Sequence, residues 1–212
     1  MRPETVSGAL GRYGALLADA GVPQARLDAR LLVQLGLGIS HEELLATPGR
    51  RLTESELGRI DRLIDRRAAR EPVSRIAGER EFYGRTFAVT PDTLDPRPDT
   101  ETLVETALEI ARQRLHSLTA PRLADLGTGS GAVAVSLISE LPQWTGVATD
   151  VSAAALGGAN GNALRHKVTS RLAFIRTTWL DSVPGRFDLI VANPPYIPSA
   201  EIDGLAPEVA AF

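Results

Sequence analysis

Apolar positions in the first third of the chain recur at the spacing of helices with one buried face. Three such stripes can be followed, namely Ala9, Leu10, Tyr13, Leu16, Leu17 and Ala20, then Leu27, Leu31, Leu32 and Leu35, then Leu57, Ile60, Leu63 and Ile64. Ser40 with Glu43 and Thr53 with Glu56 have the spacing of capping boxes, and Pro72 is expected to end the helices. We predict a helical domain over residues 1–75, which either recognises a substrate or only buries its own stripes.

The pattern changes after Pro72. Residues 76–92 read as a β-hairpin that turns near Gly84 and connects two domains. A one-faced helix is predicted from Thr102 to Leu115, and from Arg122 short apolar strands alternate with helices. The predicted strands are Leu123–Leu126, Gly146–Thr149, Leu172–Ile175 and Phe187–Ala192, with a helix at Ala132–Leu141. The alternation predicts an α/β domain over residues 93–212, a parallel sheet with helices on both faces.

Composition narrows the class of protein. The hydrophobic fraction of 43% and the charged fraction of 23% are those of an ordinary globular protein. No apolar run is long enough to cross a bilayer and the N-terminus lacks the apolar centre of a signal peptide, so we expect a cytoplasmic protein without a membrane partner. The net charge of −3 argues against a general nucleic-acid coat protein. The lack of cysteine excludes a thiolate metal site, and no metal is expected.

A glycine-rich loop follows the first predicted strand and reads Asp125-Leu126-Gly127-Thr128-Gly129-Ser130-Gly131. Alternate glycines let backbone approach a ligand, and the N–H groups at a helix start suit a carboxylate or a phosphate. The spacing is not that of dinucleotide binders, and the loop lacks the lysine of a P-loop. Asp150, at the end of the second strand, is placed to hydrogen-bond a ribose diol. Loop and acid together favour a nucleoside site over a plain turn.

The fourth predicted strand leads directly into Asn193-Pro194-Pro195-Tyr196. Ligands of open parallel sheets bind beyond the carboxyl ends of the strands, so this segment should lie beside the glycine loop. The two prolines remove N–H donors and leave acceptors, above all the Asn193 side-chain oxygen, which suit an –NH2 substrate. Tyr196 is expected to pack against a flat substrate group. Positioning of a poorly nucleophilic nitrogen would be the main catalytic effect, and a proline-rich turn without chemistry is the alternative.

These segments together resemble the protein-(glutamine-N5) methyltransferases that modify release factors, the PrmC or HemK family. The likeness runs from about Gly21 to the end of the chain. Besides the two segments above, it rests on Asp28-Ala29-Arg30-Leu31-Leu32, Glu71-Pro72-Val73, Gly78-Glu79-Arg80-Glu81-Phe82-Tyr83-Gly84 and Pro96-Arg97-Pro98-Asp99-Thr100-Glu101. Many amino-group methyltransferases share the Asn-Pro-Pro-Tyr segment, whereas the helical domain with the Pro-Arg-Pro-Asp-Thr-Glu run is more selective.

The resemblance implies a Rossmann-like class I methyltransferase sheet, incomplete at the C-terminus, behind a small N-terminal helical domain. It implies S-adenosylmethionine as cofactor, held by Gly127, Thr128, Gly129, Ser130, Gly131, Asp150, Trp179 and Asn193. Asp150 would hold the ribose, and Trp179 would lie against the adenine. The Pro96–Glu101 segment would close over the cofactor, or would form a rigid turn with Asp99 capping the next helix.

The resemblance also implies a substrate, the glutamine in the Gly-Gly-Gln motif of peptide-chain release factors. Its binding residues would be Asn193, Pro194, Pro195 and Tyr196, of which Asn193, Pro194 and Tyr196 would be catalytic. We expect a monomer without direct sequence-specific nucleic-acid binding. Two alternatives stay open, an enzyme that methylates an exocyclic amine of nucleic acid and a non-catalytic remnant that binds cofactor or partner. Gly157, Gly158 and Gly161 fall where the family has a helix and are expected to weaken it.

Overall fold

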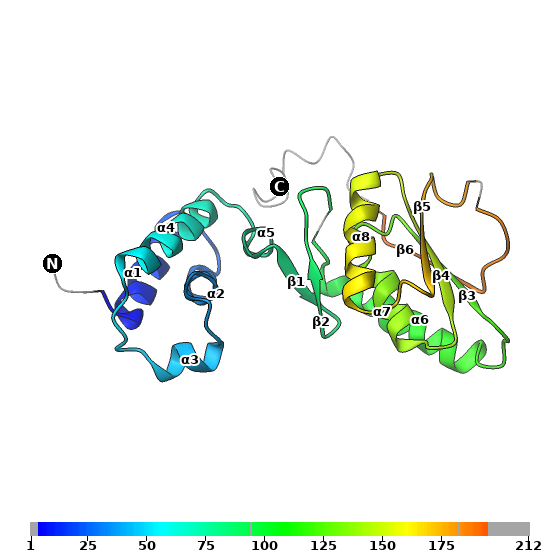
Figure 1. The fold of residues 1–212 in the computed structure, drawn as a ribbon, viewed down its shortest axis with the longest axis horizontal. Coiled ribbons are helices and arrows are strands. Elements are labelled where there is room, and N and C mark those ends of the chain that lie inside the picture. Colours follow the sequence, from blue (N-terminus) through cyan, green and yellow to red (C-terminus); the bar gives the residue numbers. More distant parts are fainter. Residues whose placement is uncertain (1–3, 94, 182, 195–212) are drawn as a thin grey trace. The chain divides into compact units, whose positions relative to one another are not determined.

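The computed structural model describes residues 4–93, 95–181 and 183–194. They form two compact units, one ending at Ala77 and the other beginning at Gly78 (Figure 1). Each unit has its own core of buried apolar side chains. Within the described ranges, no helix combines the length and the apolar character that a membrane span requires.

The first unit is helical in its described residues. Its elements are α1 (Val6–Asp19), α2 (Ala25–Leu37), α3 (His41–Ala46), α4 (Glu54–Ala68) and α5 (Val73–Ala77). Both predicted capping boxes are confirmed. Ser40 and Thr53 accept hydrogen bonds from the N–H groups of Glu43 and Glu56, and each glutamate bonds the N–H of its cap residue in return.

The buried face of α2 is not the predicted leucine stripe. Leu27, Leu31 and Leu35 are 46%, 41% and 42% exposed. The buried residues of α2 are Ala25, Asp28, Ala29, Leu32, Val33 and Gly36. Several of them are small, and a Cβ added at Gly36 would lie only 2.6 Å from the Ile60 Cγ1 of α4. Small side chains let the helices approach closely, so the expected stripe is wrong for three of its leucines.

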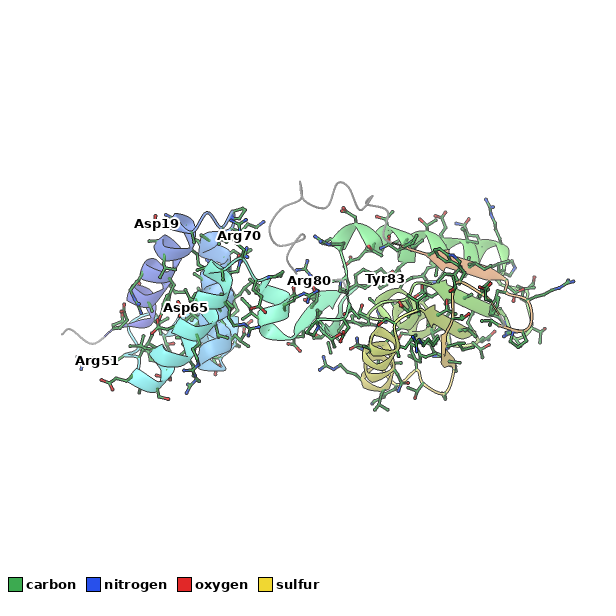
Figure 2. All side chains as sticks on the ribbon, turned by 90° about the horizontal axis from the view of Figure 1, so that it is seen from above. Asp19, Arg51, Asp65, Arg70, Arg80 and Tyr83 are labelled. Atoms are coloured by element: carbon green, nitrogen blue, oxygen red, sulfur yellow. The ribbon has the colours of Figure 1, made fainter. Side chains whose placement is uncertain are left out.

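A buried ion pair joins α2 to α4. The Arg67 Nε donates to the Asp28 Oδ2 at 2.7 Å, and both side chains are buried. Other charged side chains of this unit, including Asp19, Arg51 and Asp65, are exposed on its outside (Figure 2). A buried charge is costly unless it is paired, so Asp28 has a structural role as the partner of Arg67.

Pro72 does not end the helical region as expected. α5 begins at the next residue, Val73, and the Ile76 N–H donates to the Pro72 carbonyl at 3.0 Å. Proline is tolerated at the start of a helix because the N–H that it lacks would have no intrahelical acceptor there. Pro72 therefore opens a short helix.

The second unit begins with the predicted hairpin, formed by β1 (Glu79–Phe82) and β2 (Arg85–Ala88). Tyr83 and Gly84 at its tip have φ values of 50° and 66°, which suit a tight hairpin turn. Phe82 and Phe87 are buried in the core that the hairpin shares with the helices and sheet of this unit. A short 3-10 turn, η1 (Pro98–Thr100), then leads into α6 (Glu101–Arg114).

The second unit also contains a four-stranded sheet whose described strands are all parallel, as predicted. Its strands and the intervening helices are β3 (Arg122–Leu126), α7 (Ala132–Glu140), β4 (Thr145–Asp150), α8 (Ala153–Arg165), β5 (Leu172–Arg176) and β6 (Leu189–Ala192). The spatial order is β5-β4-β3-β6. Strand order therefore reverses at β3, which has β4 on one side and β6 on the other.

The helices of the second unit form one layer in the described residues, not the two that we expected. α7 packs over β3, β4 and β5, and it also contacts both α6 and α8 (Figure 1). The crossovers from β3 to β4 and from β4 to β5 step in the same direction across the sheet. Right-handed crossovers that step in one direction place their helices on the same face, which explains the single layer.

α8 forms although it contains three glycines. Gly157, Gly158 and Gly161 all lie inside it, and Ser152 caps its start by accepting from the Ala155 N–H. Its apolar side packs against β4 and β5 and buries Ala159. Tertiary packing supplies most of the stability of helices in proteins, so the low helix propensity of glycine does not prevent this one.

Candidate active site

The carboxyl ends of β3, β4 and β6 lie next to one another where the strand order reverses. Leu126 at the end of β3 is in register with Thr149 on one side and Ala192 on the other. In open parallel sheets such a reversal leaves a crevice beyond the strands in which ligands bind. The glycine loop follows β3, Asp150 ends β4 and Asn193 follows β6. The fold thus brings the glycine loop, Asp150 and Asn193 to the carboxyl-terminal end of the sheet, where β3 lies between β4 and β6 (Figure 1).

Backbone conformation accounts for glycine at three alternate positions of the loop. Gly127, Gly129 and Gly131 have φ values of 69°, 55° and 79°, which residues with a side chain rarely adopt. Among the described residues, no atom lies within 4 Å of a Cβ added at Gly127 or Gly129. A Cβ at Gly131 would lie 3.0 Å from the Ala159 Cβ of α8. The first two glycines therefore leave room for a ligand, and the third lets α8 pack against the loop.

Asp150, the candidate ribose ligand, also holds two backbone groups. Its Oδ2 accepts the N–H of Gly129 at 3.0 Å, and its Oδ1 accepts the N–H of Ser152 at 2.9 Å. The carboxylate thus ties the glycine loop to the start of α8. Each carboxylate oxygen can accept a second hydrogen bond, so a ribose hydroxyl can bind without releasing the loop.

A second carboxylate, Asp125, supports the loop from the end of β3. It is 2% exposed, and it accepts the Thr128 hydroxyl at 2.6 Å and a backbone hydrogen bond from Ala134 in α7. Burial raises the pKa of Asp125 from 3.8 to about 6, although these hydrogen bonds oppose the shift, and the charge of Asp150 adds to it. The sequence pattern indicated no role for Asp125, and its place two residues before Gly127 was the only signal for one.

Trp179 lies in the turn after β5, the strand beside β4. The Thr177 N–H in this turn donates to the Asp150 carbonyl at 3.1 Å, which draws the turn to the end of β4. Trp179 is 52% exposed and has a φ of 51°, which is rare for a bulky side chain. A large exposed aromatic ring, carried by a turn that is bonded to the candidate ribose ligand, is suited to pack against a flat ring system.

Asn193 follows β6 directly and has a definite partner. Its Nδ2 donates to the Thr100 hydroxyl at 3.0 Å. With the nitrogen committed to Thr100, the Asn193 Oδ1 is the atom left to accept from a substrate. Pro194 is the last described residue of the chain and is partly buried, and Pro195 and Tyr196 lie outside the described residues.

The Pro96–Glu101 run forms the entry to α6, and Asp99 is not its cap. The cap position is Thr100, which makes no side-chain cap bond, and the Glu101 N–H donates to carbonyls within the 3-10 turn Pro98–Thr100. The expected Asp99 cap is wrong because carbonyls of the turn already accept the N–H at the start of the helix. The Thr100 hydroxyl instead accepts from Asn193, a contact that no sequence pattern in this run predicts.

Asn162 joins the hairpin to the glycine loop and was also missed. This fully buried residue of α8 accepts the Ala88 N–H through its Oδ1 at 2.8 Å. Its Nδ2 donates to the Ala88 carbonyl at 3.1 Å and to the Ser130 carbonyl at 2.9 Å. The only sequence signal was a polar residue beside Ala163 on an otherwise apolar face.

Comparisons with known proteins agree with this geometry. Residues 101–206 match the family model described as Methyltransferase small domain, and residues 9–78 match that of the PrmC N-terminal domain. The release factor glutamine methyltransferase of Bradyrhizobium diazoefficiens is 47% identical over 206 residues, which are 97% of this chain and 69% of that protein. Its counterpart in Nitratidesulfovibrio vulgaris is 43% identical over 210 residues, 98% of this chain and 70% of that protein. A solved structure, human methyltransferase 10 domain containing protein, is 19% identical with a TM-score of 0.44 over 56% of this chain and 59% of its own, a likeness too weak to support an argument.

The parallel sheet and the match over residues 101–206 make this chain a methyltransferase of the class that takes its methyl group from S-adenosylmethionine. Three relatives that are 42–47% identical along 97–98% of this chain are all named release factor glutamine methyltransferases. The chain belongs to the release factor glutamine methyltransferase family.

The residues at this edge of the sheet fit S-adenosylmethionine. The amino acid part of that molecule needs backbone close by, and the space over Gly127 and Gly129 is open. Its ribose diol needs an acceptor, and Asp150 is a carboxylate that ends the neighbouring strand. Its adenine needs a flat apolar surface, which the half-exposed Trp179 can offer.

Proposed function

We propose that this chain transfers a methyl group from S-adenosylmethionine to the side-chain amide nitrogen of a release-factor glutamine, in the Gly-Gly-Gln motif, in the cytoplasm. Family membership supports this substrate, because the relatives are named release factor glutamine methyltransferases. The observation that carries the proposal is the placement of Asn193. It follows β6, next to the strand of the glycine loop, and its side-chain nitrogen is bound to Thr100.

Methylation of an amide nitrogen requires that the enzyme position this nitrogen for attack. Its lone pair is delocalised into the neighbouring carbonyl, so it is a poor nucleophile and must be held in position. The Asn193 Oδ1 accepts a hydrogen bond from the target –NH2 and orients it, an interaction that strengthens as the nitrogen loses amide resonance. Pro194 adds no N–H donor beside this acceptor. S-adenosylmethionine, when bound, would supply a sulfonium methyl; its transfer to the nitrogen would leave S-adenosylhomocysteine, and the proton lost by the amide nitrogen would pass to water.

The other site residues divide the remaining tasks. The loop Gly127, Thr128, Gly129, Ser130 and Gly131 binds the methionine part of the cofactor, and Asp150 binds its ribose while it keeps the loop in place. Trp179 lies against the adenine. We also assign Pro195 and Tyr196, which lie outside the described residues, to the substrate site with Asn193 and Pro194.

The helical unit recognises the protein substrate. Its surface offers an apolar row on α2, Leu27, Leu31 and Leu35, whose members are four residues apart and at least 41% exposed. Exposed apolar rows of this kind are typical of protein-interaction surfaces. Such a surface can bind a protein substrate, whereas a free amino acid would be too small to need it.

The test is a transfer assay with methyl-labelled S-adenosylmethionine and an intact release factor. The proposal predicts label on the Gly-Gly-Gln glutamine, located by mass spectrometry of the digested factor. A factor with that glutamine replaced by alanine is the matched control and should stay unlabelled. Label on DNA or RNA instead would contradict the proposed substrate, and no transfer to any acceptor, with cofactor binding intact, would show that the chain only binds.

A further inference from the structure

Thr100 holds the Asn193 amide by a side-chain hydrogen bond. An amide side chain carries an acceptor oxygen on one side and a donor –NH2 group on the other, and rotation by half a turn exchanges them. A hydroxyl can donate or accept, and the Thr100 hydroxyl accepts from the Asn193 Nδ2, which leaves the amide oxygen free to accept elsewhere. The 3.0 Å contact from this nitrogen to the Thr100 hydroxyl has that arrangement.

Thr100 is itself fixed by its surroundings. It ends a 3-10 turn that begins with Pro98, and its N–H donates to the Arg97 carbonyl at 3.0 Å. The next residue, Glu101, accepts the N–H of Tyr83 at the hairpin tip through its Oε1 at 2.9 Å. Pro98 restricts the backbone on one side of Thr100, and the hydrogen bond from the hairpin to Glu101 restrains it on the other. The position of the Thr100 hydroxyl is therefore well defined.

The reversed amide would oppose the reaction. It would turn the Asn193 –NH2 group toward the target –NH2, and two donors cannot hydrogen-bond to each other. An unheld amide would also spend part of its time in other rotamers. The bond to Thr100 restrains the Asn193 rotamer before the substrate arrives, in an orientation that leaves the amide oxygen free to accept.

We propose that Thr100 is a positioning residue for methyl transfer, which holds the Asn193 amide with its oxygen toward the target nitrogen. This inference rests on the proposed function, because it assigns Asn193 the acceptor role. It gives one residue of the Pro96–Glu101 run a task in the reaction in addition to its place at the start of α6.

The test compares Thr100→Val, which keeps the shape of the side chain and loses the hydroxyl, with Thr100→Ser, which keeps the hydroxyl. Thr102→Val, an exposed change two residues away on α6, is the matched control. Thr100→Val should lower kcat about fivefold to tenfold, as expected for one lost hydrogen bond. The KM for release factor and the Kd for S-adenosylhomocysteine should stay as in the parent, and Thr100→Ser and Thr102→Val should turn over like the parent.

Two further measurements separate this inference from a structural effect and from the proposed function. In an Asn193→Ala background, Thr100→Val should lower the residual rate no further, because Thr100 acts through Asn193. In the nuclear magnetic resonance spectrum, Thr100→Val should shift the side-chain NH2 resonance of Asn193, and Thr102→Val should not. A parent that methylates no release factor would refute the proposed function, and an unshifted resonance would then refute this inference independently. Parent-like kcat in Thr100→Val overturns it in any case.

Discussion

Two carboxylates near the glycine loop illustrate how one residue type serves different tasks. Asp150 is partly exposed at the strand end and holds the Gly129 N–H, whereas Asp125 is buried and holds the Thr128 hydroxyl. The sequence predicted Asp150 because an acid at the end of the second strand is a known nucleoside signal. It gave no role to Asp125, because nothing in a strand pattern shows that a side chain is buried under a loop.

The first prediction concerns Asp150. Asp150→Ala should weaken S-adenosylhomocysteine binding by about 1–3 kcal/mol, because the ribose loses its acceptor and the loop loses its tether. Asp150→Asn keeps one acceptor oxygen and should fall between parent and alanine variant. Titration calorimetry measures both, and an unchanged affinity in Asp150→Ala would remove Asp150 from the cofactor site.

The second prediction follows from the raised pKa of Asp125. Its folded pKa of about 6 lies above the ordinary 3.8, so the folded state binds the proton more tightly than the unfolded state. The stability that this group contributes is full below pH 3.8 and is lost as the pH rises through about 6. Relative to Asp125→Asn, the parent should lose about 3 kcal/mol of unfolding free energy across that window. Both tryptophans, Trp144 and Trp179, belong to this unit, so their fluorescence follows its denaturation, and parallel pH curves for the two proteins would contradict the prediction.

Among the helices and strands, helix caps and strand positions could be predicted from the sequence, whereas the buried face of a helix that depends on its neighbours could not. The capping boxes at Ser40 and Thr53 and the parallel strands were predicted because they depend on short spacings and on apolar runs. The leucine stripe of α2 was wrong at Leu27, Leu31 and Leu35 because the buried face also contains Ala29 and Gly36, whose small side chains give a weaker apolar signal than leucine. Pro72 was misread because proline is equally suited to follow one helix or to open the next.

The third prediction tests the glycines of α8. Gly157 and Gly161 are exposed, and no described atom lies within 4 Å of a Cβ added at either position. Gly157→Ala and Gly161→Ala should therefore each stabilise the second unit by about 0.5–1 kcal/mol, through higher helix propensity. Gly131→Ala is the opposing control, because its φ of 79° and its contact with Ala159 make alanine destabilising there. The free energy of unfolding is measured by denaturant titration with tryptophan fluorescence. A lower free energy of unfolding in both α8 variants would contradict the prediction.

At the scale of the whole molecule, the site is assembled from segments that are remote in sequence. Asn193 and Thr100 are 93 positions apart, and Asn162 bonds Ala88 across 74 positions. No spacing rule connects such residues, so their contacts emerge only when the sheet brings β6 beside β3 and when α8 packs on the hairpin. The strand-end placement of Asn193 and of the glycine loop was predictable, because it follows from the topology of parallel sheets.

The fourth prediction concerns substrate selection by the helical unit. Leu31→Asp should raise the KM for intact release factor several-fold, because it places a charge in the exposed apolar row of α2. The kcat should stay near the parent value, and so should activity toward a short Gly-Gly-Gln peptide. Leu164→Asp, on the exposed side of α8, is the matched control and should leave the KM unchanged. Equal KM values for the Leu31 variant and the parent would refute a role of this surface.

The most direct test of the central claim is the turnover of Asn193→Ala with intact release factor and S-adenosylmethionine. The account predicts a loss of two or more orders of magnitude in kcat, about 3 kcal/mol, because a preorganised acceptor at the reacting nitrogen is removed. The Kd for S-adenosylhomocysteine should change little. Asn193→Asp keeps an acceptor and should retain more activity than the alanine variant. An Asn193→Ala variant that turns over like the parent would contradict the account.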